Sequence, residues 1–387
     1  MPVALVRRSQ AGKSTQPGVG DDGTEAGHSA TDHESADEGA ERWGGVLLSG
    51  ATTVRVTPAA NRTPGRPGTG AAGTLRRGVG VWLMALTITA LAVWWIGVGY
   101  QVLARDHDLR RVLTVAQGRM FGPVLVLVVI AVFLAERCWP AVRRPSLARA
   151  HVVDGGYLVL FAAVGPLVTL LDTGFAVTVE RHAHFLVLGR LPLVPQLVVV
   201  AAIVVGIDAM NWAAHVANHR WLSLWRFHAL HHSQEDMSVL TTFRTHPLAH
   251  VSYLPALLPA LVLEVSGTVP GAALIAYGCL VTLPHANLRW TFGPVGRVVV
   301  SPAYHRLHHA SGPVDDHAAV NFGFVLVCWD RLVGCAVHPS GPVPIATGIA
   351  GRPVPVEQGV AWPRVGHVVV EQLFQPFRIR AAADGAA

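Results

Sequence analysis

The chain has 387 residues, of which 51% are hydrophobic and only 14% are charged. Soluble proteins carry about 25% charged residues, so the composition excludes an ordinary cytosolic enzyme. The formal net charge is +6, and arginine carries nearly all of the positive charge. The arginines form no stripe with interleaved aromatic residues, so a nucleic-acid partner is not expected.

The N-terminal part divides into a polar tail and two apolar runs. Residues 1–75 are rich in Gly, Ser, Thr and Pro and lack apolar periodicity, which predicts a disordered N-terminal tail. Residues 78–104 are uncharged and long enough to cross a hydrocarbon layer of about 30 Å. A second apolar run follows at 120–135. We expect these two runs to form an N-terminal transmembrane hairpin within residues 76–150.

Three more apolar segments follow. The runs 155–171 and 191–207 are separated by a polar stretch and predict a second helical hairpin, whose last helix continues towards His215 and His219. The block 251–284 is interrupted by polar residues and proline, which predicts two short helices dipping into the bilayer. The expected fold is an all-α integral membrane protein with about four transmembrane helices, a short membrane-dipping helical hairpin and a cytoplasmic helical histidine-rich cap.

The orientation is predicted from the arginines around the first hairpin. Arg76 and Arg77 precede it, and Arg143, Arg144 and Arg149 follow it. Because cytoplasmic flanks carry an excess of basic residues, both ends of this hairpin are assigned to the cytoplasm. An even number of crossings then returns the chain to the same side before the histidine-rich segment. We therefore expect a multi-pass membrane protein with its histidine motifs on the cytoplasmic face.

Histidine is concentrated in one part of the chain, with 12 of the 20 histidines between residues 215 and 317. Most of these belong to three motifs: HxxxH at 215–219, HxxHH at 228–232 and HxxHH at 305–309. Residues spaced by three or four positions share one face of an α-helix, so each motif gathers its imidazoles on one stripe. Eight convergent imidazoles exceed the ligands of one tetrahedral ion, which predicts two metal ions.

The ligand type narrows the choice of chemistry. Imidazole binds Zn, Cu, Fe and Ni, but the chain has no HExxH motif to supply the general base of a zincin-type peptidase. Iron is favoured because it activates dioxygen and the site lies beside the bilayer. A divalent-metal transporter, a membrane zinc hydrolase and an inactive scaffold remain alternatives. A transporter would place its ligands at the bilayer midplane, whereas these motifs follow the apolar runs.

The order of the three motifs resembles the fatty acid hydroxylase/sterol desaturase superfamily, over about residues 130–336. Four further segments carry the resemblance: LWRFHALHHS at 224–233, RTHP at 244–247, HAN at 285–287, and NFG at 321–323 followed by WDRL at 329–332. The resemblance implies a membrane-bound non-haem di-iron oxygenase with a catalytic domain at 151–338. The residues that follow, 339–387, are expected to form a C-terminal tail. Such an oxygenase would hydroxylate or desaturate a fatty-acyl, sterol or isoprenoid lipid, with dioxygen as co-substrate and electrons from a separate ferredoxin or cytochrome b5-like partner with its reductase.

The resemblance also implies which residues bind the two iron ions. Carried onto this chain, the ligands are His215, His219, His228, His231, His232, His305, His308 and His309, with His285 as a ninth. Asp208 matches an acid that the family carries before the first motif. Asp208, Asp330 and Asn287 are candidates to hydrogen-bond the ring nitrogens that face away from the metal.

Other residues are less consistent with a role in the metal site. His246 and His250 are expected mainly to serve local structure, and His338 is expected to be solvated. One departure from the family pattern is Ala319, where the family usually has an aspartate two residues before the Asn-aromatic-Gly triplet. This departure concerns hydrogen bonding near the third motif more than the metal ligands.

Overall fold

The computed structural model describes residues 83, 86–101, 123–143, 149–191, 193–263, 268–311, 320–341, 343, 345–349 and 364–377. The regular elements of these residues are helices, accompanied by isolated β-bridges, so the described part is all-helical as predicted. The predicted tail at 1–75 and the Ala319 position lie outside the described residues.

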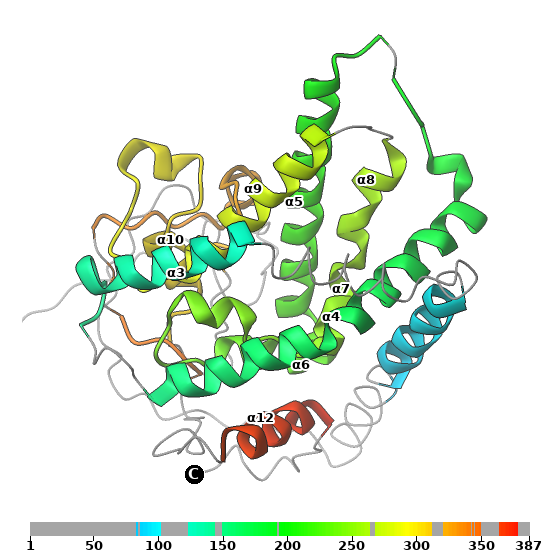
Figure 1. Cartoon of the computed structure of the whole chain (residues 1–387). Coiled ribbons are helices and arrows are strands. Elements are labelled where there is room, and N and C mark those ends of the chain that lie inside the picture. Colours follow the sequence, from blue (N-terminus) through cyan, green and yellow to red (C-terminus); the bar gives the residue numbers. More distant parts are fainter. Residues whose placement is uncertain are drawn as a thin grey trace, which may run out of the picture. The chain divides into compact units, whose positions relative to one another are not determined.

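Figure 1 labels the main helices. The α-helices are α3 (Pro123–Cys138), α4 (Arg149–His182), α5 (Gln196–Arg220), α6 (Leu222–His232), α7 (His250–Tyr253), α8 (Leu258–Val262), α9 (Thr268–Thr282), α10 (Pro302–His308), α11 (Cys328–Leu332) and α12 (Val365–Phe374). Short 3-10 helices lie between them or, for the last, after α12: η1 (His184–Leu186), η2 (Val239–Phe243), η3 (Pro247–Ala249), η4 (Leu254–Leu257), η5 (Leu283–His285), η6 (Gly293–Arg297) and η9 (Gln375–Phe377). A further apolar helix, Leu86–Gln101, precedes α3.

Two of the described helices are long and apolar enough to cross a membrane. They are His151–His182, within α4, and α5, with mean hydropathies of 1.9 and 2.0. They match the predicted second hairpin, and α5 runs on to His215 and His219 as expected. The other apolar helices of the described residues are shorter: Leu86–Gln101, Pro247–Val262 and Ala272–His285. The structure thus supports two candidate spans, where the sequence predicts about four.

The helix Leu86–Gln101 packs closely against α4 at two glycines. Gly99 lies against the main-chain carbonyl of Leu170, and Gly174 lies against that of Trp95. A Cβ atom at either glycine would overlap backbone atoms of the other helix. Small residues allow such close approach between membrane helices, which explains why glycine occurs at both positions.

We expect Gly174→Ala to destabilise this crossing by about 1–3 kcal/mol, because overpacking a tight contact costs that much. Thermal unfolding of the purified protein in detergent measures the loss. Gly97→Ala is the matched control, because nothing lies within 4 Å of a Cβ built at Gly97 and both changes bring the same gain in helix propensity. Equal melting temperatures for the two variants would contradict the crossing.

Helix α5 is both a candidate membrane span and the helix that carries the first histidine motif. It packs against α6, α7, α8, α9 and η4, and Figure 1 shows it as the long green helix beside α8. Gly206 of α5 makes room for Pro259 of α8, whose ring would meet a Cβ at that glycine. After α5, the extended Trp221 turns the chain directly into α6. This sharp turn places the second histidine motif beside the first.

Helix α12 lies within the segment predicted as a C-terminal tail. It packs against α4 (Figure 1). Its buried face joins one hydrophobic cluster, made of Val153, Tyr157, Leu230, Val365, Val368 and Val369. The segment 364–377 is therefore packed against α4 and against α6, which carries the second histidine motif.

Candidate metal centre

The nine histidines predicted as ligands lie together in two groups. The five-histidine group consists of His215, His219, His228, His232 and His308, and the four-histidine group consists of His231, His285, His305 and His309. Within each group the candidate ligand atoms all lie within 4.8 Å of one another, and neither group contains a carboxylate or a thiol. All nine side chains are buried except the half-buried His219. Helices α5, α6 and α10 and the short η5 supply eight of them, and His309 directly follows α10.

Consecutive histidines of the second and third motifs are divided between the groups. His232 belongs to the five-histidine group and His231 to the other; His308 and His309 are divided in the same way. Neighbouring residues of an α-helix point about 100° apart, which allows one turn of helix to face two sites. The two groups are in contact, because the rings of His232 and His309 stack with centroids 4.3 Å apart.

The five-histidine group presents unused nitrogen lone pairs in its interior. Four Nε2 atoms are buried and have no hydrogen-bond partner among the described residues: those of His215, His228, His232 and His308. In two of these rings the opposite nitrogen is held by a main-chain carbonyl. His215 Nδ1 donates to Phe322 O at 2.9 Å, and His308 Nδ1 donates to Val320 O at 2.8 Å. These bonds leave Nε2 as a lone-pair donor, the state that a metal ion requires.

In the four-histidine group the Nε2 atoms converge on one another. His231 Nε2 lies 2.9 Å from His285 Nε2, which in turn lies 3.1 Å from His305 Nε2. His309 Nε2 is 3.2 Å from His305 Nε2. A shared cation explains this spacing, because it can accept a lone pair from each of the four rings. Ordinary core packing does not explain it, because a core is built from apolar groups.

Burial keeps these rings neutral. Desolvation lowers the pKa well below 6.5 for six of them: His228, His232, His285, His305, His308 and His309. Desolvation also lowers the pKa of His231, to about 3. Because a protonated imidazole cannot bind a metal, a low pKa favours ligation at neutral pH.

Two buried carboxylates, those of Asp330 and Asp208, hold the loop of residues 321–326, which contacts the histidines. Asp330 Oδ1 accepts from Phe322 N at 3.0 Å, and its Oδ2 accepts from Gly323 N at 2.8 Å. Asp208 of α5 accepts from Val325 N and Leu326 N, at 3.0 and 3.1 Å. The loop they fix supplies the Phe322 carbonyl that holds His215.

The sequence predicts that Asp208, Asp330 and Asn287 bond the ring nitrogens that face away from the metal. For His215 and His308 the structure differs from this prediction. Main-chain carbonyls hold the rings of His215 and His308, whereas Asp208 and Asp330 accept hydrogen bonds from main-chain N–H groups of the loop. The carboxylates act one step further out, through main-chain groups of the loop. Asn287 instead bonds the main chain of Val142 and the guanidinium of Arg306. Sequence patterns identify the carboxylates but not the carbonyls, since any residue type supplies a carbonyl.

His246 and His250 both lie outside the two groups. His246 Nδ1 accepts from Leu248 N, and its Nε2 donates to Leu373 O, both at 3.1 Å. His250 Nε2 lies 2.8 Å from Asp172 Oδ1. Both rings join helices, which agrees with the structural roles expected. His338 is exposed, as predicted.

The pH dependence of stability should contain a contribution from His246. Burial lowers the pKa of His246 to about 4, from 6.5. Between these values the unfolded state binds a proton that the folded state does not, so the stabilisation is complete above pH 6.5 and is lost as the pH falls towards 4. The difference amounts to about 3 kcal/mol.

A His246→Asn variant tests this contribution. Asparagine can still cap Leu248 N but does not titrate. We expect metal-free wild-type protein to lose stability more steeply than this variant between pH 6.5 and 4, measured by denaturant unfolding in detergent. Parallel pH profiles would show that His246 is not held neutral in the fold.

Comparison with known proteins agrees with the resemblance predicted from the motifs. Residues 200–335 match the family model described as fatty acid hydroxylase, a family of dioxygen-dependent hydroxylases and monooxygenases. This segment contains all nine histidines of the two groups. No solved structure was found to match the chain.

Three curated proteins resemble the chain over part of its length. The ornithine lipid hydroxylase of Rhizobium tropici is 31% identical over 173 residues, which are 43% of this chain and 46% of that protein. The alkylglycerol monooxygenase of Caenorhabditis elegans is 27% identical over 32% of this chain and 24% of its own length. The alkylglycerol monooxygenase of Danio rerio is 28% identical, over 36% and 30%. The chain thus spans less than half the length of each of these relatives.

Proposed function

We propose that this protein is a membrane-bound non-haem di-iron oxygenase that hydroxylates a lipid, using dioxygen and electrons from a separate donor. The observation that carries the proposal is the pair of buried histidine groups within the segment that matches the fatty acid hydroxylase family. Each group would hold one iron ion, with its histidines as the ligands. Insertion of one oxygen atom into a C–H bond consumes two electrons and two protons and releases water from the second oxygen atom.

The side chains of the site support an iron pair in three ways. The buried rings are neutral at physiological pH because desolvation lowers their pKa. Main-chain carbonyls orient the rings of His215 and His308, so that Nε2 faces the group. Phe322 and Trp225 pack edge-on or tilted against His219, with centroids 5.2 and 5.0 Å away, which limits the access of water. The iron pair, when bound, would supply dioxygen activation.

The reaction and the substrate class are inferred from the relatives. Their names state a hydroxylase of ornithine lipid and a monooxygenase of alkylglycerol, so both reactions add oxygen to lipid molecules. Hydroxylation is therefore favoured over desaturation, and a polar membrane lipid over a free sterol or isoprenoid. A ferredoxin or a cytochrome b5-like protein with its reductase would supply the electrons.

The membrane arrangement is part of the proposal. Helices α4 and α5 would cross the bilayer. The apolar helix Leu86–Gln101 and α3 would also cross it, which makes about four spans. The histidine groups lie near the C-terminal end of α5, which would place them at the cytoplasmic face. Residues 151–338 would form the catalytic domain.

The first experiment is iron analysis of detergent-purified protein after anaerobic reconstitution with iron-57(II), followed by Mössbauer spectroscopy. About two iron ions per chain with a coupled spectrum after oxidation is the expected result. Membranes that contain the protein should then incorporate label from 18O2 into a lipid, detected by mass spectrometry. Zinc bound in place of iron, with no labelled lipid, would instead support the hydrolase or transporter alternative.

A further inference from the structure

The last turn of α6 determines the geometry of both histidine groups, because it carries His231 for one and His232 for the other. Arg244, which is fully buried, holds this turn. Its Nε donates to the main-chain carbonyl of Leu230 at 3.2 Å, and its Nη2 donates to Ser233 Oγ at 3.0 Å. A cation at the C-terminal end of a helix is also favoured by the helix dipole.

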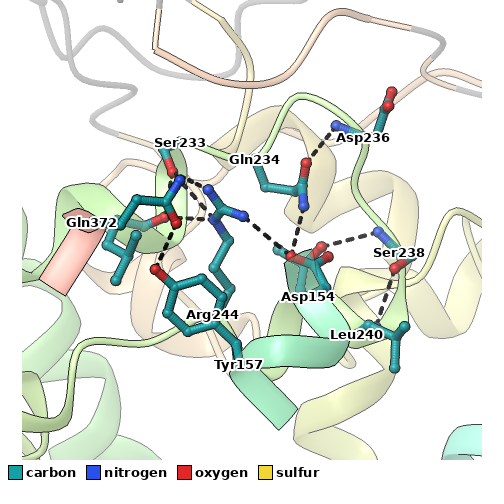
Figure 2. Close-up of polar contacts among 11 residues, drawn as sticks. Asp154, Tyr157, Ser233, Gln234, Asp236, Ser238, Leu240, Arg244 and Gln372 are labelled. Atoms are coloured by element: carbon teal, nitrogen blue, oxygen red, sulfur yellow. Dashed lines mark hydrogen bonds and ion pairs between the residues drawn. The ribbon is translucent and has the colours of Figure 1, made fainter. Parts of the chain in front are cut away.

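The guanidinium of Arg244 is itself held from α4. Its Nη1 lies 3.3 Å from Asp154 Oδ1, and both side chains are fully buried. Gln234 Nε2 donates to the same carboxylate oxygen at 2.8 Å. The ring of Tyr157, one turn after Asp154, lies 5.3 Å from the guanidinium carbon. Figure 2 shows Arg244 beside Asp154 and Tyr157, with Gln234 bonded to Asp154.

Helix α12 completes this buried network. Tyr157 Oη donates to Gln372 Oε1 at 2.7 Å, and Gln372 is 1% exposed (Figure 2). Around this bond, Val365, Val368 and Val369 of α12 pack against α4. Glutamine on an otherwise apolar face costs desolvation unless it is bonded, so its position here indicates a specific partner.

The segment that follows Gln372 also contacts the first half of α6. Arg226 Nη1 donates to Pro376 O at 3.0 Å, and the rings of Phe227 and Phe377 meet with centroids 5.7 Å apart. The C-terminal segment 364–377 is therefore attached to α6 directly at one end and through Tyr157 and Arg244 at the other. It lies beyond the segment 200–335 that matches the family.

We propose that Gln372 is a positioning residue of the metal centre. Through Tyr157 and Arg244 it fixes the last turn of α6, and with it the direction in which His231 and His232 face their two groups. Removal of the Gln372–Tyr157 bond should let this turn shift and weaken metal binding about tenfold, at the lower end of the range seen when residues behind metal ligands are changed. This inference rests on the proposed iron pair.

The test compares four single variants and one double variant, Gln372→Met with Tyr157→Phe, in the full-length protein. Gln372→Met removes the amide but keeps the length of the side chain, and Tyr157→Phe removes the hydroxyl but keeps the ring beside Arg244. Gln372→Glu restores an acceptor for Tyr157 Oη and should recover iron binding. Val370→Ala is the control, because Val370 lies on the exposed face of α12. Iron(II) affinity, the iron-57 spectrum and the melting temperature are measured for each.

We expect Gln372→Met and Tyr157→Phe to bind iron about tenfold more weakly and with altered spectra, and the double variant to be no worse than either single one. A lower melting temperature with unchanged iron affinity and spectrum would show a merely structural role and overturn the inference. Iron binding that fails already in the wild-type protein would overturn the proposed function instead.

Discussion

Double histidine variants should lose one metal ion or two, depending on whether the two residues share a group. His231→Ala with His309→Ala removes two ligands from the four-histidine group and leaves the five-histidine group complete. His232→Ala with His309→Ala removes one ligand from each group. We expect the first pair to retain about one iron ion per chain and the second to bind both ions weakly. Iron analysis after gel filtration measures the difference.

Lipid hydroxylation should fall by at least about 100-fold in both double variants, because losing a ligand costs more than losing a residue behind it. Stoichiometry, not activity, therefore distinguishes the two pairs. His338→Gln is the control, because this exposed histidine lies outside both groups. Identical iron content in the two double variants would contradict the division of consecutive histidines between two sites.

The helices and the candidate ligands could be predicted because their signals are local. Apolar runs gave the position of α5, and the spacing of its histidines placed His215 and His219 on one stripe. In the structure His215 is buried and His219 is half-buried, and both belong to the five-histidine group. His285 stands alone in the sequence, and the family resemblance was needed to select it.

The division into two groups could not be predicted from the motifs. Helical spacing gives the angle between His231 and His232, but not which neighbouring helix each ring faces. That depends on how α6 meets α10 and η5, which lie about 50 to 80 residues later in the chain. Long-range packing of this kind leaves no periodic signal in a single sequence.

The C-terminal segment lies beyond the family resemblance, which ends at about residue 336. Residues 339–387 were predicted as a tail, yet α12 packs on α4. A local signal did exist, because the apolar residues Val365, Val368, Val369 and Leu373 are spaced i, i+3, i+4 and i+8, as on one face of an amphipathic helix. The helix has only 10 residues, which is shorter than the window over which helical periodicity distinguishes a helix.

Asp330→Asn should weaken iron binding and lower the melting temperature, although the substitution changes almost no side-chain volume. Oδ1 of Asp330 accepts from Trp212 Nε1 and Phe322 N, at 2.9 and 3.0 Å. Oδ2 accepts from Tyr304 Oη and Gly323 N, at 3.0 and 2.8 Å. An asparagine must turn its amide NH2 towards one of these pairs of donors, and each buried donor left unpaired costs about 1–3 kcal/mol.

The loop 321–323 should therefore loosen, and the Phe322 carbonyl should no longer hold the ring of His215. We expect iron affinity to fall by about 10–100-fold and the melting temperature to fall with it. Trp212→Phe is a milder comparison, because it removes only the Trp212 Nε1 donor to Asp330 and brings no two donors together. Its loss of iron affinity should therefore be smaller. Glu180→Gln, on the exposed end of α4, controls for the loss of a negative charge. An Asp330→Asn variant that binds iron as tightly as the Glu180→Gln variant would show that the ring of His215 is oriented without this loop.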